Sequence, residues 1–111
     1  MPETLPSISA TEALLRLSTG RIRLLDLRKA EARAASGLTV RGAIWRDPFR
    51  LPDDSAIVED KTPAIVFCVH GHEVSQFGAA WLLLHGIDAV YVRGGFEALR
   101  AANAPLSEID A

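Results

Sequence analysis

The sequence predicts an α/β fold in which a parallel sheet is covered by helices on both faces. Segments 64–67 (Ala-Ile-Val-Phe) and 89–92 (Ala-Val-Tyr-Val) are short apolar runs, which are typical of strands buried on both sides. Other segments carry apolar residues at helical spacing, and several of them end at a glycine. Because strands alternate with helices along the chain, a parallel sheet between two helical layers is the expected arrangement.

Length and composition fit one domain, which we expect to span residues 1–111. The chain is 49% hydrophobic and 23% charged, as ordinary globular proteins are, and its net charge of −2 gives no indication of nucleic acid or an anionic membrane as partner. Its longest apolar run, 79–84, is far shorter than the ~20 residues that cross a bilayer. The first six residues lack the pattern of a signal peptide, so we expect a cytoplasmic protein.

The N-terminal third is expected to form a helix, a strand and a second helix. Ser9 and Glu12 make a capping-box pattern ahead of a helix that Gly20 ends. Residues 22–27 have the character of a strand, and residues 29–35 that of a short helix.

The remaining elements follow from the same signals. Residues 43–45 are a brief strand candidate, and 47–61, rich in proline and acidic residues, predict a long surface loop with one helical turn at 55–59. Residues 75–85 carry apolar side chains at helical intervals, and 96–103 predict a last helix after a Gly-Gly turn.

Cys68, the only cysteine, directly follows the apolar strand 64–67. It cannot form an internal disulfide, and it is either a buried small hydrophobe or a reactive thiol. Ligands of parallel α/β sheets bind at the carboxyl ends of the strands, where Cys68 is expected. A glycine-containing loop between a strand and a helix can form a nest of backbone N–H groups, which favours a thiolate and stabilises a persulfide anion.

Four segments together resemble the rhodanese-like domains. Residues 68–73 (Cys-Val-His-Gly-His-Glu) resemble the active-site loop of that family, and 25–28 (Leu-Asp-Leu-Arg) resemble its first signature. Residues 40–44 resemble a weakened Gly-His-Ile-x-Gly-Ala signature, and 92–96 resemble the closing Gly-Gly motif. The four segments occur in the family order and extend over almost the whole chain.

The resemblance implies a five-stranded, mostly parallel sheet flanked by helices, and a sulfurtransferase activity. Cys68 would take sulfur from a donor such as thiosulfate and pass its persulfide to cyanide, a thiol or a protein acceptor, without any cofactor. It implies loop support or anion recruitment by Asp26 and Arg28. It implies substrate binding by the loop residues Val69, His70, Gly71, His72, Glu73 and Val74.

Loop length separates two activities within the resembled family. A six-residue loop accompanies sulfur transfer, whereas a loop one residue longer that ends in arginine accompanies phosphatases and arsenate reductases. The sixth residue after Cys68 is Val74, so the arginine that would clamp a phosphate or arsenate is absent. The resemblance therefore favours sulfur transfer.

Three loop side chains leave alternatives open. A Glu73 carboxylate pointing into the nest would cost a bound anion roughly 3 kcal/mol at ~5 Å, and we expect the outward orientation. His70 and His72 are solvated side chains, or rim groups that attract an anionic donor when protonated, or metal ligands together with Cys68. A curled loop splays its side chains, which argues against a metal site.

The arginines are also ambiguous. Arg28 is expected in an ion pair with Asp26 or Glu31 that ties loops together. The candidates for recruiting anionic donors beside the pocket are Arg33, Arg41 and Arg46. Beyond the enzyme, two functions stay open: a redox or persulfide-sensing module without turnover, and a metal or metalloid binder.

Overall fold

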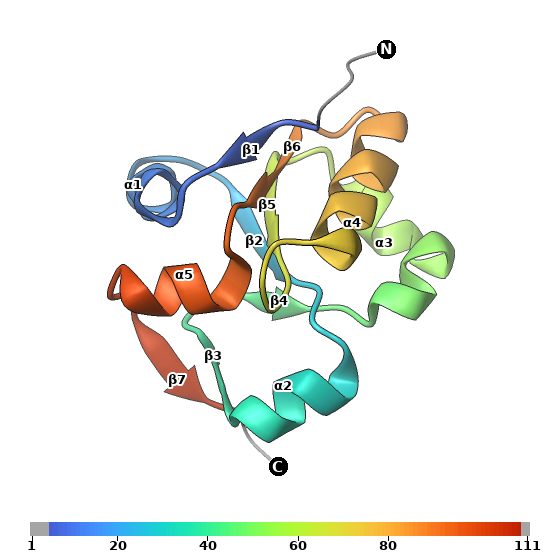
Figure 1. Ribbon diagram of the computed structural model, residues 1–111. Helices are drawn as coiled ribbons and strands as arrows, with labels where there is room; N and C mark the ends of the chain where they lie inside the picture. The colour runs from blue at the N-terminus through green and yellow to red at the C-terminus, as the bar shows by residue number, and fades with distance from the viewer. Residues whose placement is uncertain (1–4, 110–111) are drawn as a thin grey trace.

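The computed structural model describes residues 5–109 and shows an α/β fold around a five-stranded sheet (Figure 1). All four strand pairings of this sheet are parallel, which confirms the predicted architecture. The strand order is β1-β6-β5-β2-β4, formed by β1 (Ser7–Ile8), β2 (Arg23–Asp26), β4 (Ile44–Trp45), β5 (Ala64–Phe67) and β6 (Ala89–Val92).

Helices cover both faces of the sheet (Figure 1). One face carries α1 (Ala10–Thr19) and α5 (Gly95–Ala101), and the other carries α3 (Ser55–Glu59) and α4 (Glu73–Leu84). A further helix, α2 (Ala30–Ser36), follows β2 and lies beside a small second sheet. Within residues 5–109 no helix is long and apolar enough to cross a membrane.

The central strand β5 divides the core into two clusters because its side chains alternate between the faces. Ile65 and Phe67 pack with apolar residues of α1 and α5, whereas Ala64 and Val66 pack with residues of α3 and α4. All four residues of β5 are buried, as the apolar run predicts. Cys68 is therefore attached to the most enclosed strand of the sheet, which fixes the start of the following loop.

The antiparallel pair β3 (Leu38–Val40) and β7 (Leu106–Glu108) was not predicted from the sequence. Each strand has only three residues, Leu-Thr-Val and Leu-Ser-Glu, which is too short for an alternating pattern to stand out in the sequence. β1 was also missed because two residues are too short to show a period. Pairing with a neighbouring strand, rather than local pattern, creates these elements.

Segment 47–61 is more ordered than the predicted surface loop. It begins with a 3-10 helix, η1 (Pro48–Asp53), whose first turn is capped by the Asp47 carboxylate accepting from the Phe49 N–H at 3.0 Å. The predicted turn at 55–59 is confirmed as α3. The loop prediction was wrong because Leu51 and Ile57 are buried in the core and hold the segment against α4 and the sheet.

Helix boundaries follow the predicted caps with small differences. Ser9 accepts the Glu12 N–H at 3.1 Å, as predicted, but the Glu12 side chain pairs with Arg16 instead of reaching back to the cap. α4 begins at Glu73, two residues before the predicted start, and its first turn therefore lies closer to Cys68. The domain bounds predicted from the sequence extend at both ends beyond the described residues, and the segment considered for a signal peptide lies partly outside them.

Candidate active site

Cys68 lies at the carboxyl end of β5 and borders a cavity of about 440 Å³. The residue is 6% exposed, so its thiol is largely enclosed but is not sealed in the core. Chain segments that follow β2 and β5 build the cavity together, because the two strands are neighbours in the sheet. Its lining consists of Arg28, Lys29, Ala32, Cys68, Val69, His70, His72, Glu73 and Val74.

The Cys68 sulfur has a polar neighbour that the sequence analysis missed. Its Sγ lies 3.3 Å from the hydroxyl of Ser75, a fully buried residue in the first turn of α4. The Ser75 hydroxyl also donates to the His72 carbonyl at 3.4 Å. Because a hydroxyl can accept from a thiol or donate to a thiolate, Ser75 can serve both protonation states of the sulfur. The sequence signal that could have identified Ser75 was its position in the first helical turn after the loop.

The carbonyl groups of the loop are held by the helices around it. Phe96 N–H donates to the Cys68 carbonyl at 2.7 Å, and Glu97 N–H donates to the Val69 carbonyl at 3.3 Å, both from the first turn of α5. Gln76 of α4 donates through its side-chain amide to Gly71 O at 3.2 Å. These bonds fix the path of the loop through its oxygen atoms.

In the part of the chain that the structure describes, the N–H groups of the same loop have no acceptors. Within residues 5–109 no hydrogen bond uses the backbone N–H of residues 69–75 as donor. Residues 73–75 belong to the first turn of α4, where N–H groups have no intrahelical partner and the helix dipole favours negative charge. The loop therefore has the donors that an anion attached to the Cys68 sulfur requires.

Two glycines allow the loop to pack against the β6–α5 turn. Gly71 has φ +75°, and a Cβ atom there would lie 2.6 Å from the Val92 carbonyl oxygen. Gly95 has φ +60°, and its Cβ would lie 2.4 Å from the Cys68 carbonyl oxygen. Both positions need glycine because of the backbone conformation and because of this close approach. The glycines of the loop motif and the closing motif thus meet in space.

Arg28 is committed to a buried ion pair with Asp26, as expected, and not with Glu31. Its Nε donates to Asp26 Oδ1 at 3.0 Å and its Nη2 to Oδ2 at 2.8 Å, with both residues almost fully buried. The Nη2 atom also donates to the Leu38 carbonyl at 2.8 Å, and the guanidinium lies over the Phe96 ring at 4.2 Å. Two of its three guanidinium nitrogens bond to the Asp26 carboxylate and the Leu38 carbonyl, so Arg28 ties β2 to β3 while it packs against α5.

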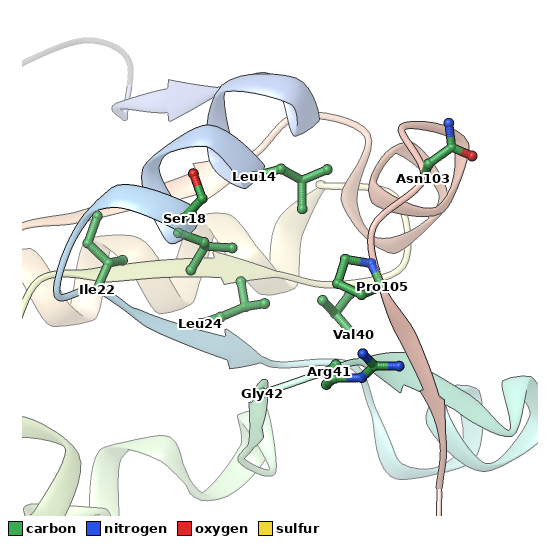
Figure 2. Close-up of a pocket in the computed structure, with 10 residues that line it drawn as sticks. Leu14, Ser18, Ile22, Leu24, Val40, Arg41, Gly42, Asn103 and Pro105 are labelled. Carbon is green, nitrogen blue, oxygen red and sulfur yellow. The ribbon is translucent and has the colours of Figure 1, made fainter.

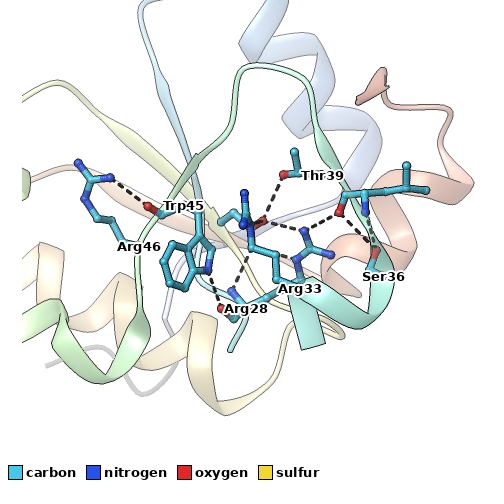
Figure 3. Close-up of polar contacts among 8 residues, drawn as sticks. Arg28, Arg33, Ser36, Thr39, Trp45 and Arg46 are labelled. Carbon is cyan, nitrogen blue, oxygen red and sulfur yellow. Dashed lines mark hydrogen bonds and ion pairs between the residues drawn. The ribbon is translucent and has the colours of Figure 1, made fainter. Parts of the chain in front are cut away.

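Further contacts extend this network to α2 and β4 (Figure 3). Thr39 donates to Asp26 Oδ2 at 3.2 Å, and the Arg33 Nε lies 3.7 Å from the same oxygen. The Trp45 indole donates to the Arg28 carbonyl at 2.9 Å, and the Arg33 guanidinium lies over the Trp45 ring. The Asp26 carboxylate therefore connects three segments: the residues after β2, helix α2 and strand β3.

Arg28 lines the Cys68 cavity, but the other three arginines considered for donor recruitment do not. Arg33 lies on Trp45, Arg46 pairs with Asp54 at 2.8 Å, and Arg41 borders a different hollow. The exposed cation at the cavity is Lys29, which the sequence analysis missed. The available sequence signal was that Lys29 lies three residues after β2, and β2 is the neighbour of β5, the strand that precedes Cys68.

The rim of the cavity is polar and open to solvent. His70 and His72 are exposed, with ring centroids 6.3 Å apart, and both line the cavity. Glu73 is exposed at the rim, and no salt bridge involves it among residues 5–109. Over the same range no group of three His, Cys, Asp or Glu side chains is arranged to hold a metal ion.

A larger hollow of about 540 Å³ lies elsewhere, between α1, β2 and the segment after α5 (Figure 2). Its floor is apolar, with Leu14, Leu24 and Val40, while Arg41 stands at its edge. None of its lining side chains is a cysteine, histidine or carboxylate. The smaller cavity, which Cys68 and residues of the following loop line, is therefore the candidate active site.

Comparison with known proteins identifies relatives of the chain. The family model described as Rhodanese-like domain matches residues 9–102. The thiosulfate sulfurtransferase GlpE of Stutzerimonas stutzeri is 42% identical over 62 residues, which are 55% of this chain and 56% of that protein. The match thus spans little more than half the length of this curated relative.

Two solved structures share the fold. A rhodanese-related protein from Thermoplasma volcanium superposes with a TM-score of 0.78 at 22% identity, covering 92% of this chain and 97% of that chain. A protein of unknown function from Rhodopseudomonas palustris, described as a possible tyrosine phosphatase, also has a TM-score of 0.78, at 18% identity, covering 96% and 99%. These two likenesses concern the fold alone, so the chemistry must be argued from the loop residues.

Proposed function

The chain belongs to the rhodanese-like domain family, and from this membership we propose that it is a sulfurtransferase that carries sulfane sulfur on Cys68. The likeness to GlpE, a thiosulfate sulfurtransferase, supports thiosulfate as a donor. The observation that carries the proposal is the position of the thiol at a cavity, beside a loop whose N–H groups have no acceptors within residues 5–109.

The first half-reaction loads the cysteine. The Cys68 thiolate attacks the outer sulfur of thiosulfate, a new Sγ–S bond forms, and the S–S bond of the donor breaks with its electron pair leaving on sulfite. The N–H groups of 69–75, which have no acceptor among the described residues, stabilise the negative persulfide that results. Lys29 at the cavity attracts the dianionic donor.

The second half-reaction regenerates the thiolate. A thiophilic acceptor, cyanide or a thiol, attacks the outer sulfur of the persulfide, and the Sγ–S bond breaks with its electron pair returning to Cys68. The Ser75 hydroxyl, 3.3 Å from the sulfur, donates to the thiolate as it is released. No metal or organic cofactor takes part in either step of this scheme. We further propose a cytoplasmic location, where a reducing environment keeps a single thiol free.

Intact-mass measurement of the purified protein tests this proposal. After exposure to thiosulfate the mass should rise by that of one sulfur atom, and cyanide should remove the addition and yield thiocyanate. Cys68→Ser should neither gain the mass nor turn over. A protein that gains the mass but does not release it to cyanide or to thiols would instead be a persulfide-holding module.

A further inference from the structure

The peptide group between Gly71 and His72 is held differently from its neighbours in the loop. The carbonyl groups of Cys68 and Val69 accept from backbone N–H groups of α5, at 2.7 and 3.3 Å. The Gly71 carbonyl instead accepts from the side-chain amide of Gln76, at 3.2 Å, and over residues 5–109 no backbone N–H donates to it. The orientation of this one peptide therefore depends on a single side chain.

The direction of the Gly71 carbonyl also sets the direction of the next N–H. In a planar trans peptide, as the Gly71–His72 peptide is, the C=O and the N–H point in opposite directions. Because Gln76 holds the oxygen toward α4, the His72 N–H points away from Gln76. His72 lines the Cys68 cavity, and its N–H has no acceptor in the described part of the chain.

Gly71 needs such a restraint because it has no side chain. The position that its Cβ would take lies 2.6 Å from the Val92 carbonyl oxygen, so the neighbouring turn encloses its α-carbon but leaves the peptide plane free to rotate. His72 has φ −100°, and a full reversal of the plane would carry this angle into the region that residues with side chains rarely adopt. Loss of the Gln76 bond should therefore widen the rotation of the plane without inverting it.

Gln76 is placed to restrain the peptide and not to touch a substrate. Its backbone N–H donates to the His72 carbonyl at 3.1 Å, which fixes its own position relative to the loop. Its side chain is half-buried and does not line the Cys68 cavity. Any effect of Gln76 on the chemistry must therefore pass through the peptide that it holds.

We propose that Gln76 is a positioning residue, which holds the Gly71–His72 peptide so that the His72 N–H donates to the anion on the Cys68 sulfur. The inference rests on the proposed sulfurtransferase function and adds to it a residue outside the cavity. An N–H that is already oriented stabilises the developing persulfide without reorganisation. The N–H groups of Val69 and His70 belong to peptides that α5 holds, so they do not depend on Gln76.

Two variants of Gln76 test the proposal, because each removes the donor in a different way. Gln76→Met removes it without adding charge, whereas Gln76→Glu keeps the shape and leaves a carboxylate that only accepts. In the unmodified protein, loading from thiosulfate should shift the NMR signals of the Val69, His70 and His72 amides. In both variants the His72 shift should be largely lost, while the Val69 and His70 shifts remain.

The rate of loading gives a second measurement on the same variants. The maximal rate of persulfide formation should fall roughly three- to tenfold, as expected when one hydrogen bond to the product anion is weakened. Leu84→Met is the control for Gln76→Met, since it places the same residue at an 83% exposed position at the end of α4. This variant should keep the rate and all three amide shifts.

The outcomes distinguish this proposal from the proposed function. An unmodified protein that forms no persulfide from thiosulfate refutes the proposed function. A protein that forms the persulfide, but whose His72 amide shifts equally with and without the Gln76 donor, refutes the positioning role alone. That role is also refuted if all three amide shifts are lost together, because Gln76 would then support the whole loop. Should Gln76→Met not fold, Gln76→Glu decides by the same criteria.

Discussion

Gly71 and Gly95 are in direct backbone contact at the active-site loop. A Cβ atom on Gly95 would lie 2.7 Å from the Gly71 nitrogen, and one on Gly71 would lie 3.1 Å from the Gly95 nitrogen. The two residues come from loops that follow neighbouring strands, β5 and β6, and each has a positive φ. Loop 68–74 and turn 94–95 therefore form one unit, and the conformation around Cys68 depends on both.

Gly95→Ala should lower the free energy of unfolding by about 3–5 kcal/mol, because it combines a disfavoured φ with a backbone clash. Gly37→Ala is the matched control: Gly37 has φ +70° but no atom within 4 Å of its Cβ position, so only about 1–2 kcal/mol should be lost. Urea unfolding followed by circular dichroism measures both values. Equal losses in the two variants would show that the contact with the Cys68 loop contributes nothing.

Ser75→Ala should slow persulfide formation from thiosulfate by about three- to tenfold, because the thiolate loses one hydroxyl donor. Ser18→Ala removes an exposed hydroxyl on α1 that bonds only to its own helix, and this variant should keep the rate of the unmodified protein. Rapid-quench mixing followed by intact-mass measurement gives the rate of persulfide formation. If the Ser75 variant loads sulfur at the normal rate, the hydroxyl serves the fold only.

Lys29→Gln should raise the KM for thiosulfate by about three- to tenfold at low salt, since it removes the exposed cation at the cavity. The effect should shrink as ionic strength rises. Lys61→Gln controls for net charge, because Lys61 bonds to the His85 carbonyl away from the cavity. Equal KM values for the two variants would assign donor attraction to the loop N–H groups alone.

Glu73→Gln should change the KM for thiosulfate by less than about threefold, because the exposed carboxylate is screened by water. Glu59→Gln on α3 provides the matched loss of one exposed charge. Steady-state kinetics over a range of thiosulfate concentrations would detect a difference. A tenfold gain in affinity with Gln at position 73 would mean that the carboxylate points into the nest.

The sequence predicts the parts of this fold that depend on local pattern. The apolar run of β5 and its position before Cys68 predict both a buried strand and the end of the sheet at which the thiol lies. Of the rhodanese-like signatures, the segments with Arg28 and Cys68 line one cavity, and the segment with Gly95 packs against the Cys68 loop.

Other features depend on contacts between distant segments and leave little trace in the sequence. β3 and β7 exist because Leu38 pairs with Glu108 and Val40 with Leu106, which no window of a few residues contains. Leu51 is buried within a segment rich in proline and acids, whose composition is typical of a loop. Lys29 reaches the cavity because β2 and β5 are neighbours in the sheet. That neighbourhood is a property of the folded sheet and is not visible in the sequence around Lys29.

Within residues 5–109, carbonyl groups of the loop accept hydrogen bonds, whereas its N–H groups have no acceptors. This difference allows the charge on the Cys68 sulfur to be followed by NMR. The Phe96 amide, bonded at 2.7 Å to the Cys68 carbonyl, is protected from exchange with solvent and supplies a fixed reference signal. The amides of 69–75 have no acceptor within residues 5–109, so their NMR resonances respond to each charge that arrives on or leaves the sulfur. Loading and discharge can therefore be followed in real time without a label on any substrate.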